Sequence, residues 1–365
     1  MPFDPNAAAP ADSGVFGLVT PAEQCRVRLL PVPFEATTSY GGGTSRGPDA
    51  IFEASKQVDL FDLETGRPYE AGIRMEKAPA GVARLNRAAK AEAAKVIAAG
   101  GVIGADRKLR RALDAVNAAS EKVNELVHAA AARLLDEGRL VGLVGGDHST
   151  PYGLIRALSE RRPGLGILHV DAHADLRDAY EGFTWSHASI MFNVVRRLPA
   201  VARLVQVGIR DFCEQEQDVI TGSAGRIRTH YDAEMSAARF RGETWADRCR
   251  KIVADLPAEV YVSFDIDGLD PTLCPHTGTP VAGGLSFQEA AYLVGEVARS
   301  GRRIVGFDLN EVAPGPRGDE WDANVGARML YKLIGFTLLS ERNAAPTAAA
   351  RKGRKSAAIR TRRTP

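Results

Sequence analysis

Residues 165–175 read LGILHVDAHAD, a stretch that joins a buried strand to a group of polar side chains. Its first six residues are apolar except for His169, and they lack the polar alternation of a strand with one face in water. Such a run is typical of a parallel strand that is covered on both faces. Asp171, His173 and Asp175 follow, each two residues after the last. Because alternate side chains of an extended chain share a face, this spacing predicts that the three groups enter one space.

Other apolar, β-branched segments resemble this strand, and longer segments of helical periodicity separate them. The expected strands are residues 26–32, 139–144, 165–170, 203–208, 259–264 and 303–308, and the expected helices include 107–137, 286–300 and 322–340. Ser286 is a candidate N-cap, and Glu289 completes a capping box. This alternation predicts an α/β fold with a doubly wound, mostly parallel sheet.

Composition indicates one large domain between two irregular ends. The chain has 365 residues, 45% hydrophobic and 25% charged, so it can bury a sizeable core. No linker interrupts residues 15–340, which we interpret as a single catalytic domain. Residues 1–14 are predicted to be a disordered leader. Residues 341–365 carry a net charge of +7, whereas residues 1–340 carry −5, which together give the +2 of the whole chain. The last 25 residues are therefore predicted to be a basic, disordered tail. A solvated extension is a simpler interpretation of this tail than a contact with nucleic acid.

The cysteines and the apolar runs indicate a cytoplasmic protein. Cys25, Cys213, Cys249 and Cys274 are widely spaced and form no CxxC pair, which argues against a disulfide framework. No signal peptide opens the sequence, and no apolar run approaches the ~20 residues of a membrane span. We therefore expect no membrane partner.

Polar residues follow the expected strands at the same end. The segments GGDHST, DAHAD, IRD, DIDGLDP and LNEVAP each come directly after an apolar run. In an open α/β sheet, ligands bind beyond the carboxyl ends of the strands. The sequence therefore predicts one functional site at this edge of the sheet.

The residues expected at this edge are typical of a metal site. The candidate ligands are His148, Asp171, His173, Asp175, Asp265 and Asp267. Asp265 and Asp267 are also two residues apart at the end of an expected strand, so they are expected to share a face of that strand. The four carboxylates of the candidate ligands would repel one another strongly in a cleft of low dielectric, and a pair of divalent cations would relieve that repulsion. Carboxylates without thiolates favour Mn²⁺ over a structural zinc or an iron–sulfur cluster, while Ni²⁺, Co²⁺ and Zn²⁺ stay possible.

Other residues in these motifs have simpler interpretations. His169 lies inside the apolar run, and we expect a buried histidine with its hydrogen bonds satisfied. Asp147 and Asp270 are expected to shape turns, and Gly145 and Gly146 to permit close backbone approach. His128, His230 and His276 have no ligand-like context.

Taken in order, GGDHS (145–149), DAHAD (171–175) and SFDIDGLDP (263–271) resemble the three signatures of the ureohydrolases, the family of arginase and agmatinase. The resemblance extends over about residues 25–340. It implies a three-layer α/β/α sandwich around a mostly parallel sheet of eight strands. It also implies hydrolysis of a guanidinium group to urea and an amine.

The resemblance further implies two Mn²⁺ ions and assigns roles to the ligands. His148, Asp171, Asp175 and Asp265 would bind one ion, and His173, Asp171, Asp265 and Asp267 the other, so that Asp171 and Asp265 bridge. Two such cations lower the pKa of water toward neutrality and supply a nucleophile. Two more positions match the family. Glu311 in LNEVAP resembles the glutamate that pairs with the guanidinium, and His187 in FTWSHAS resembles the histidine that passes protons to the departing amine.

The resemblance favours agmatine, with putrescine and urea as products. The loop 178–186, DAYEGFTWS, lacks the Ser-Gly-Asn stretch that arginases carry, and Cys213 stands about where arginases have an aspartate. The segment 33–51 looks like the agmatinase opening. Guanidinobutyrate, guanidinopropionate and free guanidine are the rival substrates. Aromatic and acidic residues of the loop are expected to line a pocket for the substrate tail, with Trp185 as a binding residue beside Tyr180, Glu181 and Phe183.

Two other classes of function stay open on the sequence. One is a non-catalytic family member that acts through assembly, since family members are commonly trimers or hexamers and we expect a homo-oligomer. The other is a bimetallic phosphoesterase, for which Arg177 and Arg210 near the same edge would form a basic clamp.

Overall fold

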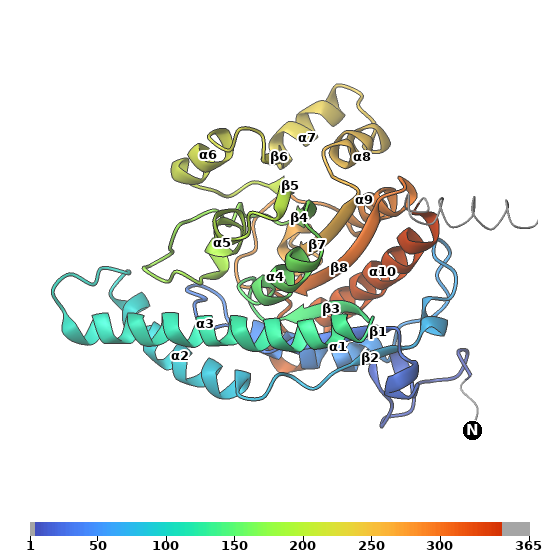
Figure 1. Ribbon diagram of the computed structural model, residues 1–365, viewed down its shortest axis with the longest axis horizontal. Coiled ribbons are helices and arrows are strands. Elements are labelled where there is room, and N and C mark those ends of the chain that lie inside the picture. Colours follow the sequence, from blue (N-terminus) through green and yellow to red (C-terminus); the bar gives the residue numbers. More distant parts are fainter. Residues whose placement is uncertain (1–3, 345–365) are drawn as a thin grey trace, which may run out of the picture.

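In the computed structural model, which describes residues 4–344, one sheet of eight strands runs through the centre (Figure 1). The order is β2-β1-β3-β8-β7-β4-β5-β6, and every neighbouring pair is parallel. The strands are β1 (Val27–Val32), β2 (Ile73–Met75), β3 (Leu140–Gly145), β4 (Leu165–Val170), β5 (Val201–Ile209), β6 (Ile227–Tyr231), β7 (Glu259–Asp265) and β8 (Arg303–Asn310). All six expected strands are confirmed. The two that the sequence did not reveal, β2 and β6, lie at the edges, where they are short or partly exposed.

Helices cover both faces of this sheet, so the expected three-layer fold is confirmed (Figure 1). One layer contains α2 (Val82–Ala98), α3 (Arg107–Asp136), α4 (Tyr152–Arg161), α5 (Ile190–Arg197) and α6 (Glu214–Thr221). The other contains α1 (Gly47–Ser55), α7 (Asp232–Phe240), α8 (Trp245–Ala254), α9 (Phe287–Arg299) and α10 (Trp321–Asn343). Short 3₁₀ helices cover Val15–Gly17, Ala22–Gln24, Thr44–Arg46, Pro68–Ala71, His187–Ser189, Ile266–Gly268 and Pro316–Gly318.

The central strands are buried because their side chains alternate between two apolar layers. In β4, Leu165 and Ile167 pack against the α2–α6 layer, and Leu168 and Val170 pack against the layer of α9 and α10. All six residues of this strand are buried. The continuous apolar run in the sequence follows from this burial on both faces.

The helix signals in the sequence agree with the structure. The expected helices correspond to α3, α9 and α10. At the start of α9, Ser286 Oγ accepts a hydrogen bond from the Glu289 N–H at 3.2 Å, and Glu289 Oε2 accepts one from the Ser286 N–H at 3.0 Å. The predicted capping box is therefore present.

The ends of the chain are only partly described. Residues 4–14 contain no helix or strand, and the Ala11 carbonyl accepts a hydrogen bond from Lys56 Nζ at 2.9 Å. The helix α10 continues to Asn343, past the expected boundary at residue 340. The rest of the predicted basic tail, residues 345–365, lies outside the described residues.

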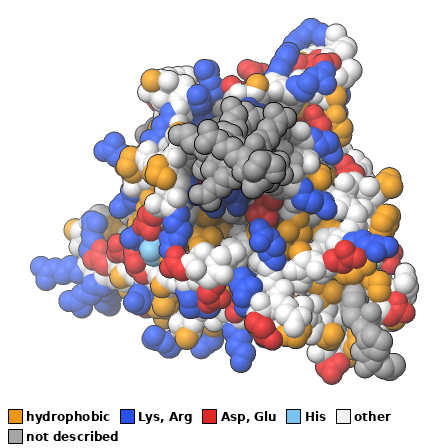
Figure 2. All heavy atoms as spheres, turned by 45° about the vertical axis from the view of Figure 1, so that its right-hand side comes forward, with side chains coloured by type: hydrophobic (Ala, Val, Ile, Leu, Met, Phe, Trp, Pro, Cys, Tyr) orange, Lys and Arg blue, Asp and Glu red, His pale blue; other side chains and the backbone are white. Residues whose placement is uncertain are grey.

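The surface of the protein carries charged side chains of both signs. On the face shown in Figure 2, Lys and Arg side chains are interspersed with Asp and Glu. None of the helices within residues 4–344 has both the length and the apolar character needed to cross a bilayer. The four cysteines are free thiols, as expected.

Candidate metal centre

The candidate ligands come from strands that lie next to one another in the sheet. His148 follows β3, the residues of DAHAD follow β4, Asp265 ends β7, and Glu311 follows β8. In the sheet order, β8 and β7 lie between β3 and β4. Since all these strands are parallel, their carboxyl ends meet at one edge, as the sequence predicted.

The chain after β4 stays extended for only part of the motif. The Arg210 and Asp211 N–H groups donate to the Ala172 carbonyl at 2.8 and 3.0 Å, so pairing with the segment after β5 continues past the end of β4. Asp171 and His173 therefore remain on one face, as expected. Asp175 reaches the same space differently, through a left-handed backbone with φ 55°. Such a conformation is uncommon outside glycine, and it persists where the surrounding structure holds it.

The expectation that Asp265 and Asp267 share the face of one strand is wrong. Asp265 ends β7, but Asp267 lies in the 3₁₀ helix Ile266–Gly268. The Asp267 N–H donates to Asp265 Oδ1 at 2.8 Å, which closes this turn. Both carboxylates still reach the centre, because the turn rather than the strand pleat directs them.

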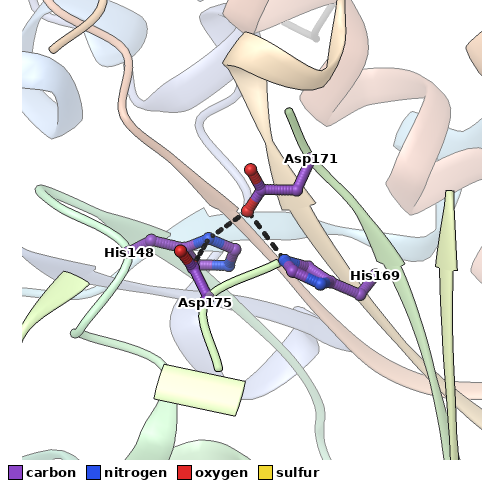
Figure 3. A group of neighbouring side chains, drawn as sticks. All are labelled: His148, His169, Asp171 and Asp175. Carbon is purple, nitrogen blue, oxygen red and sulfur yellow. Dashed lines mark hydrogen bonds and ion pairs between the residues drawn. The ribbon is translucent and has the colours of Figure 1, made fainter. Parts of the chain in front are cut away.

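One half of the centre gathers around His148 (Figure 3). Its Nδ1 lies 2.9 Å from Asp171 Oδ2 and 3.2 Å from Asp175 Oδ2. It also lies 3.2 Å from Asp265 Oδ2. These are the four residues expected to bind one ion, and all four are buried.

The other half gathers around His173. Its Nδ1 lies 3.1 Å from Asp267 Oδ2 and 3.5 Å from Asp171 Oδ1. Asp171 thus faces both halves, with a different oxygen toward each. Within residues 4–344, the one histidine of the centre that lies close to the Asp265 carboxylate is His148, so the bridging role of Asp265 stays a prediction.

The close packing of buried carboxylates in the centre favours the binding of a cation. Burial and the charges of Asp267 and Asp171 raise the pKa of Asp265 well above its usual range, and burial with the Asp171 charge raises the pKa of Asp175 to about 7. Although burial lowers it, contacts with these carboxylates hold the pKa of His148 well above its usual value. Closely packed carboxylates that cannot all ionise together are the arrangement that a divalent cation stabilises. The donor set, imidazole and carboxylate without thiolate, fits Mn²⁺ and other divalent ions.

A hydrogen-bond chain fixes the tautomer of His148. Ser263 Oγ lies 3.0 Å from His148 Nε2 and donates to Asp308 Oδ1 at 3.1 Å. Ser263 therefore accepts from the Nε2–H, so Nδ1 is the ring atom that faces the carboxylates and that would bind a cation placed among them. This orienting partner is a common feature of metal-binding histidines. No pattern in the sequence indicated this contact, because a serine within a strand has many ordinary roles.

Glu311 lies beside this centre with one oxygen unused. Its Oε1 accepts a hydrogen bond from the His148 N–H at 2.8 Å. Its Oε2 is buried and has no hydrogen-bond partner within residues 4–344. Burial and the nearby Asp147 charge raise the pKa of Glu311 well above its usual range. A backbone φ of 63° places it in the left-handed region, as at Asp175.

A cavity of about 160 Å³ opens onto the second half of the centre. His173 and Asp175 lie on its inner wall, and His187, Tyr180 and Asp211 also line it. His187 Nδ1 lies 3.3 Å from Thr37 Oγ1. Burial lowers the pKa of His187 to about 4, so its imidazole is neutral at pH 7. The structure thus brings His187 to the same cavity as the ligands.

Trp185 does not line this cavity, contrary to expectation. Its ring packs edge-on against Tyr152, with centroids 4.8 Å apart, and the Arg197 guanidinium lies 4.6 Å above it. Phe183 is fully buried in a separate apolar cluster with α2 and α3. Of the four loop residues expected at the pocket, only Tyr180 lines the cavity. Phe183 and Trp185 instead pack against apolar clusters of the core.

The two arginines near this edge do not form a clamp together, because Arg177 lines the cavity and Arg210 does not. Arg210 donates to backbone carbonyls, including those of Asp267 at 2.8 Å and Val281 at 2.8 Å. Arg177 lies 3.6 Å from Glu216 and stacks over Tyr180 at 5.0 Å. Both guanidinium groups thus contact loop residues of this chain.

Several simpler interpretations from the sequence are confirmed. His128, His230 and His276 pair with carboxylates outside the centre, namely Glu160, Asp255 and Asp322. A Cβ at Gly145 would collide with Asn310, and one at Gly146 with the Phe34 backbone. Asp270 accepts the Thr272 N–H at 2.9 Å, within a turn. His169 is buried with a partner at each ring nitrogen, but the sequence did not reveal that one partner is Asp171, at 2.7 Å.

Comparison with known proteins places the chain among characterised relatives. The sequence model of the Arginase family matches residues 25–335. An N(1)-aminopropylagmatine ureohydrolase of Thermus thermophilus is 33% identical over 318 residues, which cover 87% of this chain and 92% of that protein. An agmatinase of Bacillus anthracis is 29% identical over 293 residues, covering 80% and 85%. The crystal structure of an agmatine ureohydrolase of Thermoplasma volcanium superposes with a TM-score of 0.66 at 21% identity, covering 90% of this chain and 94% of that one.

Proposed function

This chain belongs to the arginase family of binuclear metal-dependent hydrolases, and from that premise we propose that it hydrolyses agmatine to putrescine and urea with two Mn²⁺ ions. One observation carries the proposal: the buried Oε2 of Glu311, which has no hydrogen-bond partner among residues 4–344, lies beside a centre of paired imidazoles and carboxylates. A buried carboxylate oxygen without a donor is costly. A guanidinium supplies planar N–H donors that match such a carboxylate.

The residues of the chain have separate tasks in the proposed reaction. His148, Asp171, Asp175, Asp265, His173 and Asp267 would hold the two cations, which supply a hydroxide nucleophile at neutral pH. Glu311 would pair with the guanidinium and orient its carbon toward the centre. His187, neutral at pH 7, would relay a proton to the departing amine.

The charge of the cavity favours a substrate with a cationic tail. Asp211 lines the cavity with its side chain 67% exposed. The charge of Arg177 is offset by Glu216, 3.6 Å away. Among the residues of 4–344 that line the opening, no cation is as exposed as Asp211, and such an acidic opening attracts an ammonium and repels a carboxylate. Agmatine is therefore a better match than guanidinobutyrate or guanidinopropionate.

N(1)-aminopropylagmatine is the second candidate. Several relatives are named as ureohydrolases of this compound. The cavity also opens to solvent beside Tyr40, which is 85% exposed, so a longer amine tail could leave the site there. Both candidates share the guanidinium and the cationic tail, and they differ only in length.

Urea release from a panel of substrates tests the proposal. The purified protein would be incubated with Mn²⁺ and agmatine, N(1)-aminopropylagmatine, arginine, guanidinobutyrate, guanidinopropionate or guanidine. We expect the highest kcat/KM with agmatine, and loss of activity with a chelator. Urea release from none of them would contradict the proposed reaction, and a higher kcat/KM with the longer amine would replace agmatine. We also propose a trimer or hexamer, which light scattering would measure.

A further inference from the structure

His169 is a fully buried imidazole that contacts the proposed metal centre. Its Nε2 lies 2.7 Å from Asp171 Oδ2, the oxygen that also faces His148 (Figure 3). Two roles are compatible with this distance alone. His169 could offer a lone pair to a cation, or it could donate a proton to the carboxylate. The partner of its other ring nitrogen distinguishes them.

Gln206, on the neighbouring strand β5, determines which nitrogen of His169 carries the proton. Its Nε2 lies 3.0 Å from His169 Nδ1 and donates to the Ala174 carbonyl at 2.7 Å. Since a carbonyl only accepts, the atom facing Ala174 is the amide nitrogen, and its second proton is directed at His169. Gln206 Oε1 accepts from Thr229 Oγ1 at 3.0 Å, on β6. His169 Nδ1 is thus an acceptor, and the proton of the neutral ring is on Nε2.

We infer that His169 is a positioning residue, which donates its Nε2–H to Asp171 and is itself held by Gln206. The other oxygen of Asp171, Oδ1, accepts the His173 N–H at 2.6 Å. Each carboxylate oxygen thereby has a fixed direction, one toward His148 and one toward His173. The inference rests on the proposed metal site, in which Asp171 serves both halves.

The pairing of β4 with β5 holds His169 and Gln206, the His169–Gln206 arm, in a fixed position. His169 and Asp171 are two residues apart at the end of β4, so they share a face, and β5 pairs with β4 with His169 opposite Gln206. Partners that orient a metal ligand typically change metal affinity by about 10–100-fold when they are removed. The His169–Gln206 arm is therefore expected to act on metal affinity rather than on substrate binding.

Calorimetric titration of the metal-free protein with Mn²⁺ tests this inference without an activity assay. We expect His169→Phe to raise the Kd of Mn²⁺ about tenfold or more, and His169→Gln, which keeps an N–H donor, to restore part of the affinity. Gln206→Leu should raise the Kd at least about threefold, because the ring loses its fixed tautomer. Because Gln206 acts through His169, the double variant should bind no more weakly than His169→Phe.

His230→Phe is the matched control, because it also removes a largely buried imidazole, on β6 and paired with Asp255. Its Mn²⁺ affinity should equal that of the wild type. Thr229→Val tests the arm if His169→Phe does not fold, and it should weaken Mn²⁺ binding while preserving the melting temperature within a few degrees. Unchanged affinity in His169→Phe, or tighter binding in Gln206→Leu as expected of a freed ligand, would overturn the inference. A wild-type protein that binds no Mn²⁺ would instead overturn the proposed metal site.

Discussion

His148 Nδ1 lies 2.9 Å from Asp171 Oδ2, although the two residues follow strands that are separated by two others in the sheet. The contact exists because parallel strands end at one edge, where their loops converge over β8 and β7. This pair is the core of the first half of the centre, and Asp171 faces the second half as well.

Asp171→Asn should abolish urea release and Mn²⁺ binding to at least one half of the centre. The amide removes a negative charge and one acceptor, and its NH₂ group would face either a histidine or a cation. Metal analysis after dialysis and urea assays would measure both effects. Asp270→Asn is the control, since Asp270 caps an exposed turn, and it should keep both properties. Undiminished urea release by Asp171→Asn would contradict the metal assignment.

Glu311→Gln should lower kcat/KM by a factor of about 100 or more, because one charge-assisted bond to the guanidinium becomes neutral. The same change should stabilise the metal-free protein at neutral pH. A carboxyl whose pKa is raised by burial stabilises the fold below its unfolded pKa, and that stability is lost as pH rises toward the folded pKa. Urea denaturation from pH 5 to 8 should therefore show a shallower decline in the variant than in the wild type. An identical pH dependence would argue against a buried, unpaired Glu311.

His187→Asn should reduce kcat more than it raises KM, since the histidine is proposed to move a proton. It should also change acid sensitivity. The pKa of His187 is lowered to about 4, so its contribution to stability is complete above the unfolded value of about 6.5 and is lost as pH falls toward 4. Between these values one group contributes at most about 1.4 kcal/mol per pH unit. Denaturation of metal-free wild type and variant at pH 4 to 7 would measure the difference, and parallel curves would contradict a half-buried, neutral imidazole.

Asp211→Asn should raise the KM for agmatine about threefold to fivefold, as expected for an exposed charge pair. The kcat should change little, because the tail lies away from the reacting carbon. The KM for guanidine, which has no tail, should be unaffected. Asp218→Asn on α6 is the matched control for a charge outside the cavity. Equal KM changes for agmatine and guanidine would show that Asp211 acts on the binding of the guanidinium at the centre and not on the binding of the substrate tail.

Trp185→Phe should leave kcat/KM within about twofold of the wild type, whereas a substrate-binding tryptophan would cost more. Trp185→Ala should reduce the free energy of unfolding by about 2–3 kcal/mol, since the ring fills space between Tyr152 and Arg197. Thermal unfolding and urea assays on both variants separate stability from catalysis. A specific rise in KM for agmatine in Trp185→Phe would restore the binding role.

The sequence by itself determined the fold class, the central strands and the residues of the centre. Continuous apolar runs such as 165–170 are typical of strands covered on both faces of a parallel sheet, and the polar residues that follow such strands meet at one edge. The edge strands β2 and β6 escaped prediction because three residues, or a strand with mostly half-exposed residues, give no clear periodicity.

Only the tertiary structure decided which side chains face one another. It turned Trp185 toward Tyr152, placed Asp267 in a 3₁₀ turn, and set Gln206 against His169. A loop side chain goes where packing and hydrogen bonds are best satisfied, and those partners come from strands and helices distant in the sequence. Spacing along the chain fixes a direction only while the backbone stays regular, and the backbone of this site leaves the strand pleat at Asp175 and Asp267.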